Sequence, residues 1–489
     1  IIKSYKMILI KTFRKFITKK ERNMLKIHNT LSRRKEEFVP YDKDNVKMYA
    51  CGITVSGDAH IGHLYQAMIY DIIRKVLLQN GYKVTYARNY TDIDDKIIAT
   101  ANRLHVNSAE YAEQMIKKID EEMKYFQVDE PDIWLKATEN IDNIIEFVKK
   151  LIDKGYAYVT KNGDVYYSVE KFKKYGQLSN RNLEDAKNNY RIENDEEKLN
   201  PLDFALWKSA KEGEPFWNSP WGKGRPGWHI ECSTMNMTAF GEQIDIHGGG
   251  RDLIFPHHEN EIAQTEALTG KQFAKYWVHN GLIKVNGQKM SKSLGNTIVL
   301  EELRKKYHPE VVKFALLQNS YRSDINLTDE IFDLAEKHIY NFYSLINKVK
   351  EKFGLPEQEV EGELNRLVKV ALQDDFNTPK ALSYLFDKFK EVSKKIKADD
   401  DNVAKEVGEI ISAYKILGLF INEPKKVLDF IDNKGKTQSI PDEVKALAER
   451  RWQAKQNKNY AEADKIRGEI TALGYTINDK KDGYEIVKN

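Results

Sequence analysis

The chain has 489 residues, of which 41% are hydrophobic and 31% are charged, a composition typical of soluble globular proteins with two or three domains. It contains only two cysteines and no apolar run of about 18 residues. We therefore expect no disulfide framework and no membrane-spanning helix, and we predict a cytoplasmic protein. The net charge of +4 is uneven, because residues 1–23 hold eight Lys or Arg and one Glu (+7), which leaves −3 for the rest. Bulk charge therefore does not indicate nucleic-acid binding, which would depend on local patches.

Residues 1–23 are both basic and apolar. A targeting peptide has this composition, but no small-residue cleavage site follows the segment. A chain start assigned upstream of Met24 explains the segment as well, and we favour that interpretation. We expect residues 1–23 to lie outside the fold.

A strand–helix–strand pattern comes next. Residues 47–55 (KMYACGITV) predict a buried strand, and residues 64–80 show helical apolar spacing that stops at Gly81. Residues 82–90 are rich in aromatic and β-branched side chains and predict a second strand. This spacing is typical of a parallel crossover unit, so we expect an α/β, Rossmann-like domain.

Polar residues 91–96 (TDIDDK) follow the second strand, at the end where ligands bind in open α/β sheets. For Asp94 and Asp95 we favour the alternative that they cap the next helix. The sequence pattern of the remaining chain predicts five further regions or domain halves. They are a connective insertion at 156–203 between two halves of the nucleotide-binding fold (24–155 and 204–300), a linking region at 301–329, a helical bundle at 330–422 and a C-terminal region at 423–489 with a helical pair and a small hairpin. The insertion begins with a hairpin around residues 162–163, and 3.6-residue periodicity predicts bundle helices at 330–352, 363–373, 379–397 and 402–418.

Two short segments stand about one domain apart. Residues 59–63 (AHIGH) place His60, His63 and a glycine where a strand turns into a helix, and imidazoles at a helix N-terminus can donate to phosphate. Residues 289–293 (KMSKS) form a short loop with two lysines and two serines, which suits a mobile clamp on a polyphosphate. A turn and a solvated lysine loop would explain either segment alone.

The two cysteines do not have ordinary surroundings. Cys51 lies nine residues before the first histidine of AHIGH, and Cys232 follows the segment GWHIE. Residues 255–261 predict the start of a helix, with Pro256 suited to its first turn, and His257 and Glu261, spaced i, i+4, would share one face of it. Two thiolates, an imidazole and a carboxylate can form a four-coordinate zinc site, although His258 is an equally good imidazole on spacing. The alternative is two buried free cysteines and a capped helix.

Residues 59–63 and 289–293, here called the signature segments, resemble the HIGH and KMSKS signatures of class I aminoacyl-tRNA synthetases. The chain resembles the cysteinyl-tRNA synthetase family over roughly residues 24–489. It departs from the family pattern at Ile53 and near Ser56 and Gly57, which puts the local loop shape in doubt. The matching segments are 48–52, 59–63, 89–96, 224–233, 244–261 and 289–293.

The resemblance implies specific roles for the candidate residues. The zinc ligands would be Cys51, Cys232, His257 and Glu261, with the metal holding the substrate thiolate and thereby rejecting serine. His60 and His63 on one side and Lys289 and Lys292 on the other would act on ATP, which we expect to bind with Mg²⁺. Gly52, Thr54, Thr91 and Trp228 would line the site for L-cysteine, and Asp252 would contact adenosine; ordinary core packing explains Trp228 equally well.

The helical C-terminal third resembles the family's tRNA-binding region, and we expect a monomer that binds tRNA(Cys). Arg450, Arg451, Lys455 and Lys458 are candidate phosphate contacts, although a solvated helix face explains them equally well. Two other functions are compatible with parts of the sequence: a cysteine:amine ligase built on the same catalytic domain, and a catalytically silent tRNA-binding protein. Residues 330–489 argue against the first, and the intact signature segments argue against the second.

Overall fold

The computed structural model describes residues 24–181, 197–290, 294–398, 400, 402–433, 441–457, 459–480 and 483–488. The predictions for residues 1–23, Lys292 and Lys458 lie outside these residues. The described chain divides into two compact units, one up to residue 427 and one from residue 428 onward. Within the described part, none of the helices combines the length and apolarity needed to cross a membrane.

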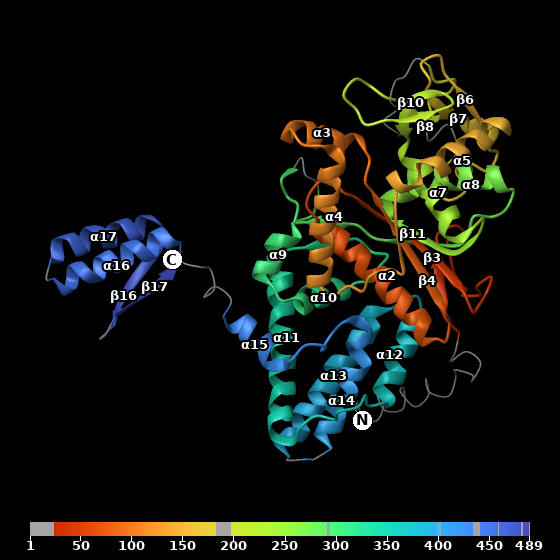
Figure 1. Ribbon diagram of the computed structural model, residues 1–489. Helices are drawn as coiled ribbons and strands as arrows, with labels where there is room; N and C mark the ends of the chain where they lie inside the picture. The colour runs from red at the N-terminus through yellow and green to blue at the C-terminus, as the bar shows by residue number, and fades with distance from the viewer. Residues whose placement is uncertain are drawn as a thin grey trace. The chain divides into compact units, whose positions relative to one another are not determined.

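The first unit is built on a five-stranded sheet in which every pairing is parallel (Figure 1). This confirms the predicted α/β, Rossmann-like class. The chain starts at β3 (Val46–Thr54), adds two strands on one side of it, and later returns to add β11 (Ile244–Gly250) on the other side. The topological switch point therefore lies between β3 and β11. The strands, in spatial order, are β12 (Ala274–Asn280), β11 (Ile244–Gly250), β3 (Val46–Thr54), β4 (Val84–Thr91) and β5 (Ile133–Lys136).

Helices cover this sheet. The first begins three residues before the predicted 64–80, because His60 caps it. Asp94 caps the next helix by accepting from the backbone N–H of Lys96 at 2.8 Å, which confirms its predicted capping role. Asp95 does not cap the helix: it lies in the first turn and pairs with Arg225 and Lys208. The helices are α2 (Ile61–Gln79), α3 (Asp95–Leu104), α4 (Ser108–Tyr125), α5 (Ile141–Asp153), α7 (Trp228–Phe240) and α8 (Glu259–Thr269).

An antiparallel sheet is inserted between the two halves of the parallel one. The predicted hairpin around residues 162–163 is its first part, and the sheet continues to Pro226, beyond the segment assigned from sequence. Leu151, Leu206 and Ile230 are fully buried where this sheet meets the flanking helices. Its strands, in spatial order, are β6 (Ala157–Val159), β7 (Val165–Tyr167), β8 (Phe204–Ser209), β10 (Gly222–Pro226) and β9 (Trp217–Ser219).

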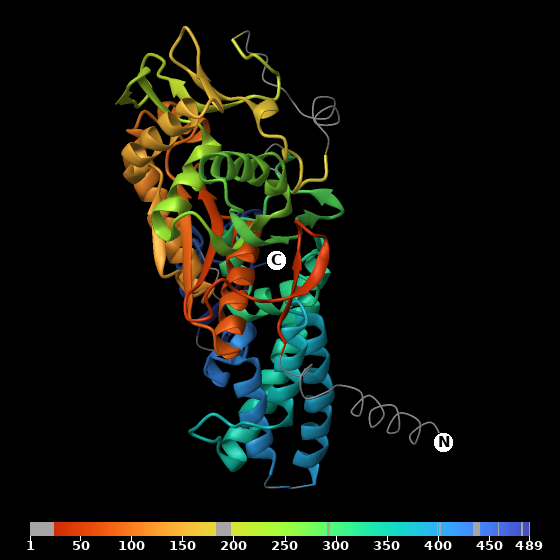
Figure 2. The same cartoon turned by 90° about the vertical axis from the view of Figure 1, so that its right-hand side faces the viewer.

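A small sheet and a helical bundle complete the first unit. Figure 2 shows the long bundle helices lying side by side, as the 3.6-residue periodicity predicts. An N-terminal hairpin, β1 (Lys26–Asn29) and β2 (Arg34–Glu37), joins the bundle to the parallel sheet, because His28 N donates to Asp375 and Asn29 Nδ2 donates to Lys275 O. The other elements are β13 (Ile283–Val285), β14 (Gln288–Lys289), β15 (Ile325–Leu327), α9 (Leu300–Lys306), α10 (Pro309–Leu317), α11 (Asp329–Phe353), α12 (Glu363–Gln373), α13 (Thr378–Lys397) and α14 (Val403–Tyr414). The boundary between the two units falls within α15 (Pro424–Asp432).

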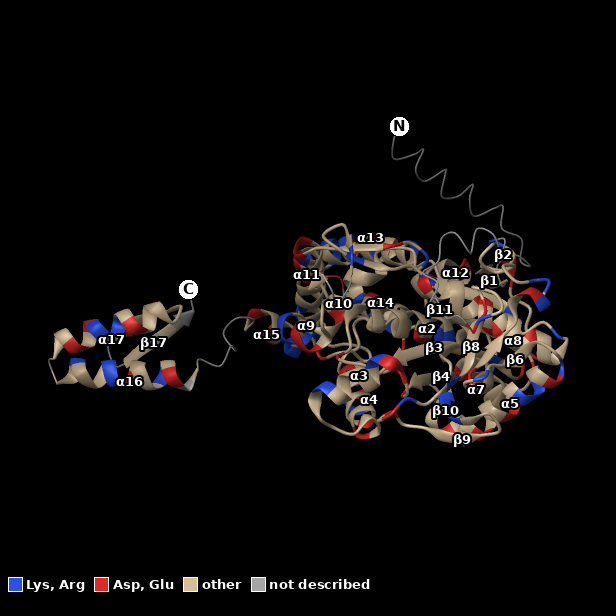
Figure 3. Ribbon diagram, turned by 90° about the horizontal axis from the view of Figure 1, so that it is seen from above, with Lys and Arg blue, Asp and Glu red and all other residues tan. Residues whose placement is uncertain are grey.

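The second unit consists of the predicted helical pair, α16 (Asp442–Gln456) and α17 (Tyr460–Ala472), and the predicted hairpin, β16 (Tyr475–Lys480) and β17 (Gly483–Lys488). Acidic and basic residues alternate along both helices (Figure 3). Arg451 is buried and donates to both carboxylate oxygens of Asp479 at 2.8 and 3.0 Å, and Lys455 pairs with the same carboxylate at 2.8 Å. Arg451 therefore holds α16 to β16 and the prediction that it contacts phosphate is wrong, whereas the phosphate contact of Lys455, whose side chain is 30% exposed, stays a prediction.

Candidate active site

A cavity of about 570 Å³ opens at the carboxyl ends of β3, β4 and β11, next to the topological switch point. It brings together residues from both signature segments and from the predicted amino-acid and metal sites. Glu261 lies behind this lining, against Cys51. The predicted residues that line the cavity are Cys51, Gly52, Thr54, His60, His63, Thr91, Trp228, Cys232, Asp252, His257 and Lys289.

The backbone at Gly52 shapes the floor of this cavity. The pairing of β3 with β4 shifts register between Ala50 and Ile53, and the Gly52 N–H donates to the Asn89 side-chain oxygen at 2.9 Å. A Cβ at Gly52 would lie 1.5 Å from the Asn89 carbonyl oxygen, so only glycine fits. The bulge leaves Cys51 buried beneath the cavity and turns Thr54 toward its rim.

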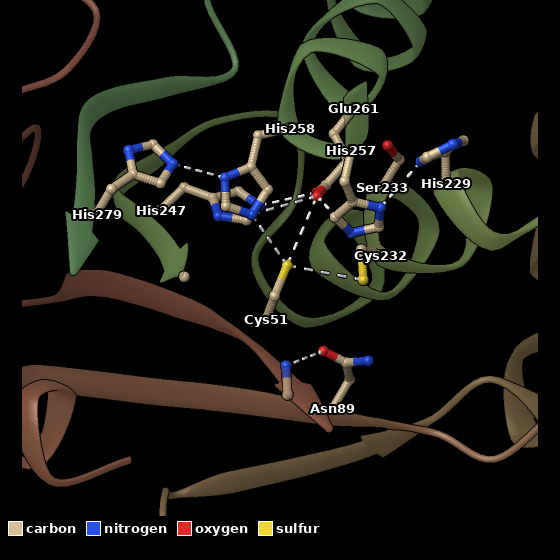
Figure 4. Close-up of polar contacts among 12 residues, drawn as sticks. Cys51, Asn89, His229, Cys232, Ser233, His247, His257, His258, Glu261 and His279 are labelled. Atoms are coloured by element: carbon tan, nitrogen blue, oxygen red, sulfur yellow. Dashed lines mark hydrogen bonds and ion pairs between the residues drawn. The ribbon is translucent and has the colours of Figure 1, made fainter. Parts of the chain in front are cut away.

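Four side chains converge at the closed end of the cavity and are here called the thiol–imidazole cluster: Cys51, Cys232, His257 and Glu261. The two sulfurs lie 3.9 Å apart, and the Cys51 sulfur is 3.6 Å from a Glu261 carboxylate oxygen (Figure 4). The same oxygen lies 3.1 Å from His257 Nε2. Cys51, His257 and Glu261 thus bring metal-binding atoms within 4.8 Å of one another, and the Cys232 sulfur, 181 residues further along the chain than Cys51, adjoins them through Cys51.

His258 is a second imidazole at the same point. Its Nε2 lies 3.3 Å from the Cys51 sulfur, and the donor atoms of Cys51, His257, His258 and Glu261 all lie within 4.8 Å of one another. The other ring nitrogen of His258 is 2.7 Å from His279. Both histidines therefore belong to this set of four, whereas the predicted set had one histidine and Cys232; the Cys232 sulfur adjoins the four through Cys51, at 3.9 Å.

Burial and charge set the protonation of the cluster. Burial raises the pKa of Glu261, but His247 and His257 outweigh it and hold that pKa well below its usual range. The hydrogen bond from Cys51 lowers the pKa of Cys232 to about 6, whereas burial raises the pKa of Cys51. Although burial opposes them, Glu261 and Cys232 raise the pKa of His257 to about 10, so without a metal the cluster holds a thiolate and a carboxylate beside an imidazolium. A divalent cation would bind in place of that proton.

The backbone before α8 differs from the prediction. Residues 254–258 form a π-type turn with non-helical angles at Phe255, so the regular helix begins at Glu259 instead of near Pro256. His257 therefore lies just before the helix and Glu261 in its first turn. Their side chains still meet, because His257 and Glu261 remain one turn apart on the same side.

The first signature segment forms the opposite wall of the cavity. His60 is the N-cap of α2, and its Nδ1 accepts from the Gly62 N–H at 3.2 Å. His63 Nδ1 accepts from the His60 N–H at 3.3 Å, and the two half-buried rings stack with centroids 3.6 Å apart. The imidazoles thus complete the helix N-terminus, where the helix dipole favours an anion.

The second signature segment approaches the first. Exposed Lys289 ends β14, and an antiparallel bridge between His60 and Val299 joins the chain beyond the loop to the first segment. The Ile61 N–H donates to Ile298 O, and the Leu300 N–H to Ala59 O, both at 2.9 Å. Backbone hydrogen bonds therefore hold residues 298–300, which follow the second segment, against the first segment.

Trp228 and Asp252 line the remaining sides. Trp228 begins α7, is 38% exposed, and stacks on His257 with centroids 4.3 Å apart. This exposure excludes an ordinary core tryptophan. Asp252 follows the buried end of β11, where the sequence predicts a flat nucleoside surface.

Several residues at the site were not predicted. Three of them are histidines: His247, whose Nε2 lies 2.8 Å from Glu261, His229, which lies 2.9 Å from His257, and His279, which lies 2.7 Å from His258. The fourth is Gln66, which donates to the Cys51 carbonyl oxygen. Each is isolated in its own stretch of sequence, so no local spacing identifies it.

Comparisons with known proteins agree with this geometry. A family model described as the catalytic domain of class I (C) tRNA synthetases matches residues 37–337. A DALR domain model matches residues 367–421, and a model of the cysteinyl-tRNA ligase anticodon-binding domain matches residues 437–486.

Individual relatives align over almost the whole chain. The cysteine–tRNA ligase of Ectopseudomonas mendocina is 46% identical over 461 residues, which cover 94% of this chain and 98% of that protein. The cysteine–tRNA ligase of Methylococcus capsulatus is 44% identical, covering 94% and 99%. Among solved structures, Mycobacterium tuberculosis methionyl-tRNA synthetase with methionyl-adenylate shares the fold, with a TM-score of 0.57 at 14% identity over 79% of this chain and 93% of that one. Taken with the cavity and its two signature segments, these matches show that the chain belongs to the cysteine–tRNA ligase family of class I aminoacyl-tRNA synthetases.

Proposed function

We propose that the cavity between the signature segments is where this cysteine–tRNA ligase activates L-cysteine with ATP and transfers it to the 3′ end of tRNA(Cys). The observation that carries the proposal is the position of the thiol–imidazole cluster. It closes one end of the cavity whose mouth is formed by the signature segments. A small thiol substrate at the closed end would place its carboxylate toward the phosphate side.

The donor set at the closed end fits a zinc ion. It offers two sulfurs, an imidazole and a carboxylate, all buried, and Glu261 is already oriented by His247. Cys51, Cys232, His257 and Glu261 would hold the ion, as the family resemblance implies, with His258 as the alternative imidazole. A bound zinc ion supplies preferential affinity for a thiolate over a hydroxyl. Gly52, Thr54, Thr91 and Trp228 would then surround the amino acid.

The phosphate side supplies donors for the charge that builds up as the bond to the α-phosphorus forms. In the first step the cysteine carboxylate attacks the α-phosphorus of ATP, and pyrophosphate leaves. His60 and His63 at the helix N-terminus would stabilise the phosphates from one side and Lys289 and Lys292 from the other. Mg²⁺ would accompany ATP, and Asp252 would contact the adenosine.

In the second step a terminal ribose hydroxyl of tRNA attacks the acyl group, and AMP leaves. We assign tRNA binding to the helical bundle (330–422) and the C-terminal region (423–489), which contain the segments matched by the DALR and anticodon-binding models. We further propose that the protein acts as a monomer in the cytoplasm. The anticodon-binding match favours this function over a cysteine:amine ligase, and the complete cavity favours it over a silent tRNA-binding protein.

The test is aminoacylation of tRNA(Cys) by the purified chain with cysteine, and with serine as the control amino acid. Charging with cysteine alone is the expected result. Adenylate formation without charging would favour the cysteine:amine ligase, and no activation would favour the silent binder.

A further inference from the structure

Tyr49 is a buried side chain next to the thiol–imidazole cluster whose hydroxyl has no established role. The residue is 0% exposed, and no described group meets both the distance and the angle of a hydrogen bond to its hydroxyl. Burial raises the pKa of this hydroxyl well above its usual range, and Cys232, Cys51 and Glu261 raise it further, with the Cys232 sulfur within hydrogen-bonding reach. A buried hydroxyl without a partner is costly, so a partner is expected in another state of the protein.

The position of Tyr49 limits what that partner can be. Tyr49 and Cys51 lie two residues apart on β3, and alternate residues of a strand face the same side. The Tyr49 ring also packs against His247, with centroids 5.3 Å apart. The hydroxyl therefore lies beside the donor atoms and away from solvent.

We propose that Tyr49 is a positioning residue that donates a hydrogen bond from its hydroxyl to the Cys232 sulfur when that sulfur binds the metal as a thiolate. The inference rests on the proposed metal site. A phenol, with an ordinary pKa of about 10, is protonated near pH 7 and can donate, while a thiolate is a stronger acceptor than a thiol. The bond would fix the sulfur's orientation and draw negative charge from it, as outer-shell partners of metal ligands do.

The chain contains a matched control. Tyr86 lies on the adjacent strand β4, is 1% exposed, and also has a hydroxyl without a hydrogen-bond partner. The groups acting on it are Arg88, Asp71 and Arg74, none of them in the cluster. Tyr49→Phe and Tyr86→Phe thus make the same chemical change in the same sheet, and only the first removes a hydroxyl beside the sulfurs.

The experiment measures metal binding by the full-length chain and both variants. Zinc affinity is determined by competition with a chelator, and the thiolate-to-metal charge-transfer band is recorded after loading with Co²⁺. We expect Tyr49→Phe to weaken zinc binding about 10-fold and to shift the cobalt band, and Tyr86→Phe to do neither. Equal unfolding midpoints of the metal-free chains would show that neither hydroxyl stabilises the metal-free fold.

Unchanged affinity and an unchanged band in Tyr49→Phe would overturn the inference, as would a Tyr49→Phe chain that does not fold. A wild-type chain that binds no metal would instead overturn the proposed metal site, so the two failures are distinguishable.

Discussion

The two ends of the active-site cavity are built in opposite ways. At the closed end, Cys51, Cys232, His257 and Glu261 are between 0 and 3% exposed and contact one another directly. At the mouth, His60 and His63 are half-buried on a helix N-terminus, and Lys289 is exposed on a short strand. The difference matches the two tasks, because telling sulfur from oxygen needs a fixed, dry donor set, whereas ATP must enter and pyrophosphate must leave through the open end.

The account therefore requires that the two ends fail independently. Damage at the closed end should abolish metal binding and cysteine selection. Damage at the mouth should slow ATP chemistry while the metal remains. A change outside the cavity should affect neither.

The largest effect is expected from Cys232→Ser, which replaces one metal-binding sulfur in a buried site. Zinc content should fall from one per chain to near zero, and cysteine-dependent ATP–pyrophosphate exchange should fall by about 10⁴-fold, because the site loses its specific donor. Metal analysis and exchange kinetics measure both. Thr238→Ala, on the same helix α7, should keep its zinc. A Cys232→Ser chain that keeps one tightly bound zinc would contradict the ligand assignment.

Lys292→Ala tests the mouth of the cavity. Exchange activity should fall by about 10³-fold, because one preorganised cationic donor to the phosphates is lost, while zinc content should not change. Lys305→Ala, on the exposed surface of α9, is the control and should keep normal activity. If Lys292→Ala lost zinc together with activity, the two ends would not be independent.

A smaller effect separates the two roles of His60. His60→Ala should lower exchange activity about 10²-fold and the free energy of unfolding by about 1 kcal/mol, because the N-cap is lost along with a phosphate donor. Asn is a good N-cap, so His60→Asn should restore the free energy of unfolding without restoring activity. Chemical denaturation and exchange kinetics provide the two readouts. Recovery of activity in His60→Asn would show that His60 acts only through the helix.

The smallest effect lies outside the cavity, in the second unit. Arg451 first, and then Lys455, hold the pKa of Asp479 well below its usual range, although burial opposes them. Because the folded pKa is depressed, the pair stabilises the fold above the unfolded value of about 3.9, and this stabilisation is lost as the pH falls through the folded pKa.

Arg451→Met should therefore destabilise the second unit by about 1 kcal/mol at pH 7 and flatten its stability profile below pH 4. Urea unfolding followed through the Trp452 indole resonance measures this, and zinc content and ATP–pyrophosphate exchange should not change. Arg450→Met is the control, because Arg450 is exposed and its ion pair with Glu462 is long, at 3.6 Å. Equal stability of both variants at pH 7 would contradict the structural role of Arg451.

Local patterns predicted most of the fold. Apolar periodicity gave α11, α12 and α13 to within one residue at each end, and turn residues indicated the hairpin of β6 and β7. Local sequence patterns predicted the structure less well where contacts between distant parts of the chain determine the backbone conformation. The π-type turn at 254–258 moves the start of α8 to Glu259, and the antiparallel sheet that includes β10 joins strands that are far apart in the sequence.

The candidate site likewise contains residues that local sequence patterns identify and residues that only the folded structure brings together. The signature segments are contiguous, so the sequence alone singled them out. The histidines at 229, 247 and 279 approach the cluster only through the folded sheet, and no spacing rule finds them. The charge pattern also gave a wrong prediction, because it placed Arg451 on the exposed face of a helix, and the structure buries Arg451 against Asp479.

The most direct test of the account is the rate of ATP–pyrophosphate exchange with cysteine and with serine, before zinc removal, after removal by a chelator, and after zinc is restored. We predict that exchange with cysteine falls at least about 10³-fold on removal and returns with one zinc per chain, and that serine does not support exchange with zinc present. A metal-free chain that activates cysteine at the full rate would contradict the claim that the thiol–imidazole cluster selects the substrate through its metal.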